Sequence, residues 1–143
     1  GLTQVNYNIT HADGLLRVYE VEHLSDFIPA NTAEEIRQKL VENHIFTRDL
    51  TNKTSFPDFT QVTEMITRFN ESRYIDPRRL SITFEALIYN NVYATYSYKG
   101  NEIFCVEIHN PELTAMQKQI FDFIWSQAKP LKFTSPHGSA RLA

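Results

Sequence analysis

Arginine and tyrosine side chains gather around one short segment, and they are the residues best suited to bind a small molecule. Three arginines bracket the sequence SRYID, and four tyrosines lie in or beside the predicted strands near it: Arg73, Arg78 and Arg79, with Tyr74, Tyr89, Tyr96 and Tyr98. Arginine beside tyrosine at strand ends commonly holds a carboxylate, phosphate or sugar. We predict ligand contacts from Arg48, Arg73, Tyr96 and Tyr98. The alternative is that the arginines pair on the surface with Glu71, Asp76 or Glu85.

The residues that usually carry out catalysis are scattered along the chain. None of the five histidines has a second histidine or a cysteine at metal-ligand spacing. Four glycines form no phosphate-binding loop, and no G-x-S-x-G motif is present. Cys105 and His109 share a predicted strand but lie roughly 13 Å apart, too far for a hydrogen bond. We therefore predict no catalytic residues, no metal site and no cofactor.

Composition limits the class of protein. With 143 residues, 42% of them hydrophobic, the chain has the size and the apolar content of one domain. A net charge of -3 argues against direct nucleic-acid binding. No apolar run reaches the roughly 18 residues that a membrane span needs, and the start lacks the features of a signal peptide. The single cysteine, Cys105, is interpreted as a small buried side chain, and we expect a cytoplasmic location.

The first half of the sequence has the pattern of a β-α-β unit. Leu15–Val21 is a predicted strand with Leu16, Val18 and Glu20 on one face, and 45–50 is the next strand. Between them, Thr32 and Glu35 match a capping box at a helix start. The helix places Ile36, Leu40 and Val41 on one face and Glu34, Arg37, Gln38 and Glu42 on the other. Such a unit favours parallel neighbouring strands.

The second half predicts a strand meander followed by a helix. A polar loop at 51–58 leads to a helix near 59–70 and a short strand at 72–75. Longer strands follow at 82–88, 92–98 and 102–109, joined by turns at 89–91 and 99–101. Asn110-Pro111 is a strong helix start. The helix buries a stripe formed by Leu113, Met116, Ile120, Phe123, Ile124 and Ala128.

The predicted fold is therefore α/β (α+β): a single domain with a mixed sheet of about six strands flanked by two or three helices.

The segment ALIYNNVYATYSYKGNEIFCVEIHNPELTAMQKQIFDFIWSQA resembles the end of the phospholipase-D-like sensor domain of TrmB-type transcriptional regulators. The matching features are Ile88-Tyr89-Asn90-Asn91, strands 92–97 and 104–109, and Phe121 with Trp125. Upstream, IRQKLVENHIFTRDL and ESRYIDP resemble further parts of that domain. The resemblance implies a phospholipase-D-like half, with residues 1–14 as an N-terminal extension, 15–130 as the sensor domain and 131–143 as a flexible tail.

The resemblance also argues against phosphodiesterase activity. Catalytic members of that superfamily carry H-x-K-x-x-x-x-D, whereas the matching positions here are Thr83, Glu85 and Asn90. Threonine is a weaker nucleophile than histidine, and the glutamate would repel a phosphate. Only about 14 residues precede the first strand, so the winged helix-turn-helix of the regulators has no counterpart.

Three functions follow from these observations. The first is a non-enzymatic regulatory or sensor domain, linked to transcription regulation, that binds a small-molecule effector, forms a homo-oligomer, or both. The second is a structural or protein-interaction module without a ligand. The third is an enzyme of unrelated mechanism built on Glu85, His109 or Cys105.

Overall fold

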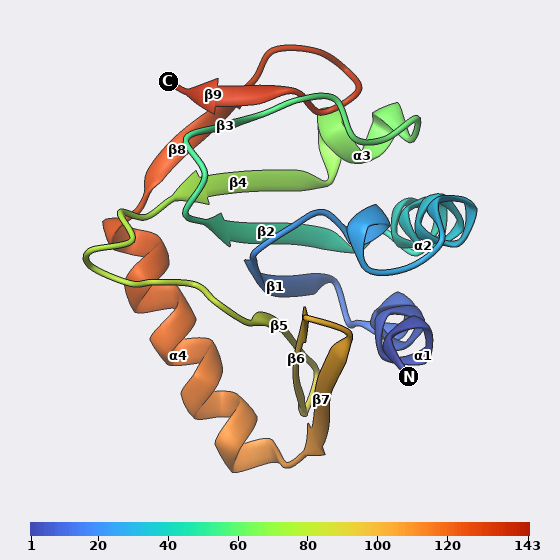
Figure 1. Ribbon diagram of the computed structural model, residues 1–143, viewed down its shortest axis with the longest axis vertical. Helices are drawn as coiled ribbons and strands as arrows, with labels where there is room; N and C mark the ends of the chain where they lie inside the picture. The colour runs from blue at the N-terminus through green and yellow to red at the C-terminus, as the bar shows by residue number, and fades with distance from the viewer.

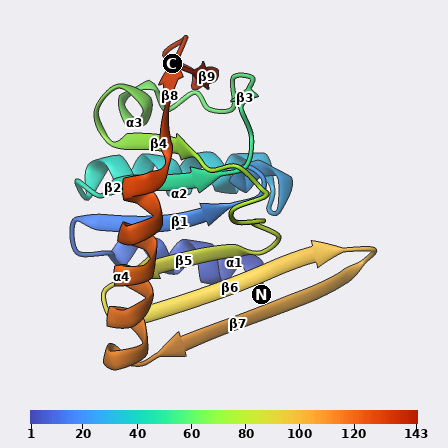
Figure 2. The same cartoon turned by 90° about the vertical axis from the view of Figure 1, so that its left-hand side faces the viewer.

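The protein folds as one mixed β-sheet with helices on both of its faces (Figures 1 and 2). The computed structural model describes residues 1–143. Nine strands run in the order β3-β9-β8-β4-β2-β1-β5-β6-β7. Their bounds are β1 Leu15–Glu20, β2 Phe46–Thr51, β3 Ser55–Phe56, β4 Asn70–Tyr74, β5 Glu85–Tyr89, β6 Val92–Lys99, β7 Glu102–His109, β8 Lys129–Phe133 and β9 Ala140–Leu142.

Four α-helices cover the sheet. The helices α1 (Leu2–Tyr7), α2 (Ala30–Glu42) and α3 (Thr63–Arg68) lie on one face, and α4 (Pro111–Gln127) crosses the other (Figure 1). Short 3-10 turns, η1 (Asn8–His11) and η2 (Leu24–Asp26), precede β1 and α2. The α+β class fits the structure. The expected counts were wrong, because the sheet has nine strands rather than about six and four α-helices rather than two or three.

The middle of the sheet follows the sequence prediction. Strands β1 and β2 are parallel neighbours with α2 between them in the chain, and β4 adds a third parallel strand. From β5 onward the strands are antiparallel. Asn90 and Asn101 have φ values of 49° and 67° in the two hairpin turns, a conformation that asparagine tolerates better than most residues. Both hairpins and the parallel β1–β2 pair are confirmed.

Both ends of the chain belong to the folded unit, contrary to expectation. Residues 1–14 form α1 and η1, and Leu2, Val5 and Ile9 are buried in the core. In place of a flexible tail, 131–143 holds part of β8 and all of β9. Strand β9 pairs with β3, which lies inside the expected polar loop at 51–58. These short strands owe their existence to long-range pairing, for which the local sequence gives no signal.

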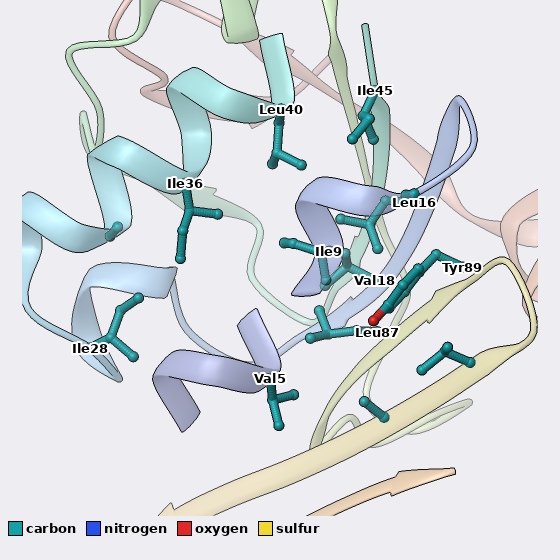
Figure 3. Close-up of a cluster of buried hydrophobic side chains, with 14 of the residues drawn as sticks. Val5, Ile9, Leu16, Val18, Ile28, Ile36, Leu40, Ile45, Leu87 and Tyr89 are labelled. Atoms are coloured by element: carbon teal, nitrogen blue, oxygen red, sulfur yellow. The ribbon is translucent and has the colours of Figure 1, made fainter. Parts of the chain in front are cut away.

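The larger hydrophobic core lies between the sheet and α1 and α2 (Figure 3). Leu16 and Val18 point from β1 toward Ile36 and Leu40 of α2, with Ile9 between them (Figure 3). Eighteen buried residues form this core. The core under α4 has only six: Leu50, Ile75, Ile88, Phe121, Trp125 and Ala128. The α4 face of the sheet is therefore held by fewer contacts.

Helix α4 begins as predicted but buries only part of the expected stripe. The side-chain oxygen of Asn110 accepts a hydrogen bond from the Leu113 amide at 2.9 Å, so the cap is confirmed. Of the stripe, Ala128 is buried and Ile124 packs against the core, whereas three residues are exposed: Met116 (51%), Ile120 (43%) and Phe123 (70%). Phe121 and Trp125 are buried instead. Apolar side chains cover a wide arc of this helix, so periodicity alone did not select the face. The aromatic contacts of Phe121 with Tyr19 and Trp125 select it.

Helix α2 begins three residues earlier than the predicted capping box implied. Pro29 precedes its first residue, Ala30, and no side chain caps it. Thr32 therefore lies inside the first turn, and the expected capping box with Glu35 is absent. No helix in the structure has the length and apolar character needed to span a bilayer.

Candidate functional site

Two of the four predicted ligand residues lie on the α4 face of the sheet. Arg48 of β2 and Arg73 of β4 place their guanidinium groups 5.7 and 4.5 Å from the centre of the Trp125 ring. Arg73 also donates a hydrogen bond to the backbone oxygen of Trp125 at 2.9 Å. Elsewhere, Arg78 forms an ion pair with Asp76 at 2.8 Å, as the surface-pair alternative predicted. Arg48 and Arg73 thus have a structural partner, α4.

The two tyrosines lie elsewhere. Tyr96 is buried on the α1 and α2 face, where the side-chain amide of Asn6 donates to its hydroxyl at 3.1 Å. Tyr98 lies near the tip of the β6–β7 hairpin and is 49% exposed. The structure therefore does not bring the four predicted residues together, and of these only Tyr96 lines the pocket described next.

A pocket lies between α2 and the strands β1, β2 and β5. Its cavity volume is about 80 Å³, and the pocket is partly open to solvent. Four carboxyl groups line it: Glu20, Asp49 and Glu85, one from each strand, and Glu22 from the loop after β1. We call it the carboxylate pocket, defined by Glu20, Asp49, Glu85, His23 and Arg37. Phe56 of β3 also lines it, so the pocket lies beside the crossover helix α2 and the segment 51–58.

The strand order explains why the three acids meet. Strand β1 lies between β2 and β5. Val18 is opposite Asp49, and Tyr19 is opposite Ala86, so Glu20 and Glu85 are the next pair along. Alternation of side chains across a strand places Glu20 on the same face as Leu16 and Val18. That face was predicted correctly, and it is the face that α2 covers.

Glu20 is at the centre of the polar contacts. Its Oε1 atom lies 2.7 Å from Nδ1 of His23, and its carboxyl group interacts with that of Asp49. Asp49 in turn accepts a hydrogen bond from the Asn70 side-chain amide at 2.7 Å. Two neighbouring carboxyl groups repel each other when both are ionised, which favours a proton on one of them.

Glu85 is anchored by the backbone. Its Oε1 atom accepts hydrogen bonds from the amides of Val21 and Glu22, each at 2.9 Å. These two amides follow β1, so the glutamate fixes the start of the loop that carries His23. The side chain is almost fully buried, at 3% exposure.

Burial and mutual repulsion separate the pKa values of the three acids. Burial, and then the charge of Glu20, raise the pKa of Asp49 well above its usual value, and the same causes act on Glu85. Burial also opposes ionisation of Glu20, yet the hydrogen bond with His23 keeps its pKa below the ordinary value. Glu20 is therefore the group that carries the negative charge, while the other two favour the protonated state.

Arg37 is the buried cation next to this cluster, but its hydrogen bonds go elsewhere. Its Nη1 atom donates to Ser25 Oγ and to the Phe59 backbone oxygen, both at 3.2 Å, and lies 3.4 Å from Glu34. Burial lowers the pKa of Arg37, an effect that Glu34 and Glu20 oppose. Arg37 thus ties α2 to the loops on either side of it.

Two buried polar atoms in the pocket wall have no hydrogen-bond partner. They are Oγ1 of Thr47 and Nε2 of His23. An unsatisfied buried polar atom costs about 1–3 kcal/mol. Such atoms are rare in folded proteins and, in a pocket, are available to a bound molecule.

No group of three or more His, Cys, Asp or Glu side chains is arranged to hold a metal ion. Of the residues considered for an enzyme, Glu85 lines the pocket, whereas Cys105 and His109 lie on β7 and do not. His109 instead contacts Glu107 at 2.7 Å. The three residues do not form one site.

Sequence reasoning missed Asp49, His23 and Arg37. Arg37 was assigned to the outer face of α2, but it is 3% exposed and lies on the inner face. A signal was present, because Arg37 directly follows Ile36 and stands one helical turn before Leu40 and Val41. Asp49 offered a similar signal as a charged residue within a strand that the β-α-β pattern places in the middle of the sheet.

No known family model matches the chain, and no curated protein is detectably similar to it in sequence. The resemblance to phospholipase-D-like sensor domains stays a prediction.

Proposed function

We propose that the protein is a non-enzymatic sensor or regulatory domain that binds a small polar molecule in the carboxylate pocket. The observation that carries this proposal is the pocket itself, where ionisable groups from α2, β1, β2 and β5 line a cavity of about 80 Å³. The sequence resemblance to sensor domains of transcriptional regulators supports the same role.

The energetic cost of the pocket supports a functional origin. Burying charged groups is expensive, and apolar residues of similar volume often give a more stable fold. Here three acids, a histidine and an arginine line a pocket whose wall includes residues of the protein's larger core. Clusters of this kind, with strongly shifted pKa values, are typical of functional sites.

A ligand in this pocket would contact α2 and three strands at once. Its binding would stabilise the packing of α2 on the sheet, since α2 provides Arg37 and Leu40 to the pocket wall. That coupling is the physical basis on which a sensor can report occupancy.

Thermal unfolding with a panel of sugars, phosphates, nucleotides, amino acids and amines tests the proposal. A ligand at 100 times its Kd should stabilise the protein by about 2.7 kcal/mol. The variant Leu24→Trp, which enlarges a half-buried residue of the pocket wall, should keep its circular dichroism spectrum and lose this stabilisation. The proposal fails if no compound stabilises the protein, or if Leu24→Trp responds like the unaltered protein.

A second candidate function is self-association, favoured by exposed apolar residues around an open sheet edge. Strand β7 is the last strand of the sheet, and Phe104 on it is 50% exposed. Phe104 contacts Phe84, itself 43% exposed, and Ile120 of α4 adds to the same face. The fitting partner is a second copy, since two β7 strands running antiparallel can place Phe104 of one opposite Val106 of the other.

Light scattering at increasing protein concentration tests this candidate. We expect a dimer that Phe104→Asp converts to a monomer, whereas Glu35→Gln on the exposed side of α2 leaves the dimer intact. If the unaltered protein stays monomeric at high concentration, self-association is excluded.

A further inference from the structure

We infer that the carboxylate pocket selects a small organic cation, a primary ammonium group on a short apolar chain. This inference rests on the proposed function and names the class of ligand for the same site. It follows from the supply of hydrogen-bond donors and acceptors, from an unpartnered buried residue and from the apolar part of the pocket wall.

The pocket has more acceptors than the protein provides donors for. Glu20, Asp49 and Glu85 contribute six carboxyl oxygens, while the protein donors that reach them are those of His23, Asn70 and the two amides that bond to Glu85. Neither Asp49 nor Glu85 forms an ion pair with a protein cation, because the nearby Arg37 is directed to Ser25, Phe59 and Glu34. An ammonium group brings three donors and one positive charge, which is what the cluster lacks.

Thr47 points independently to a bound molecule. Thr47 is 3% exposed and lines the pocket, and its Oγ1 atom has no hydrogen-bond partner. Thr47 stands two residues before Asp49 on β2, so both side chains lie on the same face of the strand. An N–H donor placed between the two residues can satisfy the hydroxyl and a carboxyl oxygen together.

The remaining wall fits an apolar chain next to the charge. Phe56, Phe59, Leu24 and Met65 line the pocket, and the Phe56 and Phe59 rings lie 5.8 Å apart. His23 stacks on Phe59 at 4.0 Å and joins this aromatic wall to Glu20. Aromatic faces also attract cations, so they favour an ammonium ligand over a carboxylate of equal size.

Binding of a cation competes with protons at this site. Carboxyl groups this close remain neutral by holding protons, and a bound ammonium can replace those protons. The titratable groups that face the pocket or contact its members come from every surrounding element: Glu20, Glu22, His23, Asp26, Glu34, Arg37, Asp49, Glu85 and Tyr96. The affinity for a cation should therefore rise with pH as the acids lose their protons.

Titration calorimetry with three probes of one chain length tests the inference on the unaltered protein. The probes are n-pentylammonium, 1-pentanol and pentanoate. We expect n-pentylammonium to bind at least tenfold more tightly than 1-pentanol at pH 8, with pentanoate weakest. Its affinity should be at least threefold lower at pH 6. Equal or tighter binding of 1-pentanol or pentanoate would overturn the inference, and so would Mg²⁺ abolishing the n-pentylammonium signal at equal concentration.

Two variants locate the binding. Glu85→Gln and Asp49→Asn replace a carboxyl group that can ionise on cation binding with a neutral amide of nearly the same shape, and each should weaken n-pentylammonium binding at least fivefold. Glu35→Gln, on the exposed side of α2, is the matched control and should bind as the unaltered protein does. Circular dichroism verifies folding. An unchanged affinity in both pocket variants would overturn the inference.

Failure of the inference is distinguishable from failure of the proposed function. If 1-pentanol, pentanoate or a metabolite binds best and Leu24→Trp abolishes that binding, the pocket is a ligand site with another preference. If neither the probes nor the metabolites bind, both proposals fail together.

Discussion

The two faces of the sheet differ in how they are held and in what they contain. The α1 and α2 face has eighteen buried hydrophobic residues, and it also encloses the buried carboxyl groups. The α4 face has six, joined by two arginines around Trp125, and it leaves Phe84, Phe104 and Phe123 exposed. The face with the larger core can bear the energetic cost of a polar pocket, whereas the other is left with apolar surface.

This difference separates two kinds of candidate function. A pocket needs a rigid wall, and α2 packed against β1 and β2 supplies it. An interaction surface needs exposed apolar residues on a stable support, and the α4 side supplies those. Three measurements can break or sharpen the contrast.

The largest expected effect is on the thinner core. Phe121→Ala removes a fully buried ring from a cluster of six residues and should destabilise the fold by roughly 3–5 kcal/mol. Phe123→Ala, two residues along the same helix but 70% exposed, should change stability by no more than about 0.5 kcal/mol. Urea unfolding measures both. Similar losses in the two variants would contradict the assigned face of α4.

The next effect concerns the pH dependence of stability in the polar pocket. The folded-state pKa of Glu85 is raised, so the native protein binds more protons than the unfolded chain above the ordinary glutamate value. Stability from this group is therefore present at low pH and is lost as the pH rises toward the folded pKa. Glu85→Gln should equal the unaltered protein near pH 4 and exceed it at pH 8 by roughly 1–3 kcal/mol.

Urea unfolding between pH 4 and pH 8 provides the comparison. Asp122 on α4 provides the control, because it pairs with Arg17 and its side chain is 46% exposed. Asp122→Asn should leave the loss of stability between pH 4 and pH 8 unchanged. A Glu85→Gln variant that loses stability at pH 8 would show that the ionised glutamate supports the fold.

The smallest effect compares the helix starts on the two faces. Asn110→Ala removes the cap of α4 and should cost about 1 kcal/mol, because the Leu113 amide loses its acceptor. Thr32→Ala in α2, where no side chain caps the helix, should be close to neutral. Thermal or urea unfolding of the two variants measures both changes in stability. A clear loss for Thr32→Ala would restore the capping box that the sequence suggested.

Local signals were enough to predict the longer strands and helices but not their long-range partners. The Asn110-Pro111 start, both hairpin turns and the parallel β1–β2 pair depend on neighbouring residues, and all are confirmed. Strands β3, β8 and β9 were missed because they are short and are defined by pairing with distant segments. The buried face of α4 was predicted only in part because apolar side chains cover a wide arc of the helix.

The candidate site was harder to predict for the same reason. Glu20 was placed on the correct face of its strand, but nothing local indicates that Asp49 and Glu85 lie beside it. Their proximity follows from β1 lying between β2 and β5. Arginine and tyrosine attracted the prediction because they are frequent in binding sites, yet Arg48 and Arg73 contact Trp125 instead.

The pairing of β9 with β3 has a consequence for how the molecule is made. These strands are separated by more than half of the sequence, and β5, far along the chain, is a neighbour of β1. Closing such distant segments is entropically costly and slows folding. A nascent chain on the ribosome therefore cannot complete its sheet until the last strand has emerged, and until then β3 and β8 remain open to unproductive association.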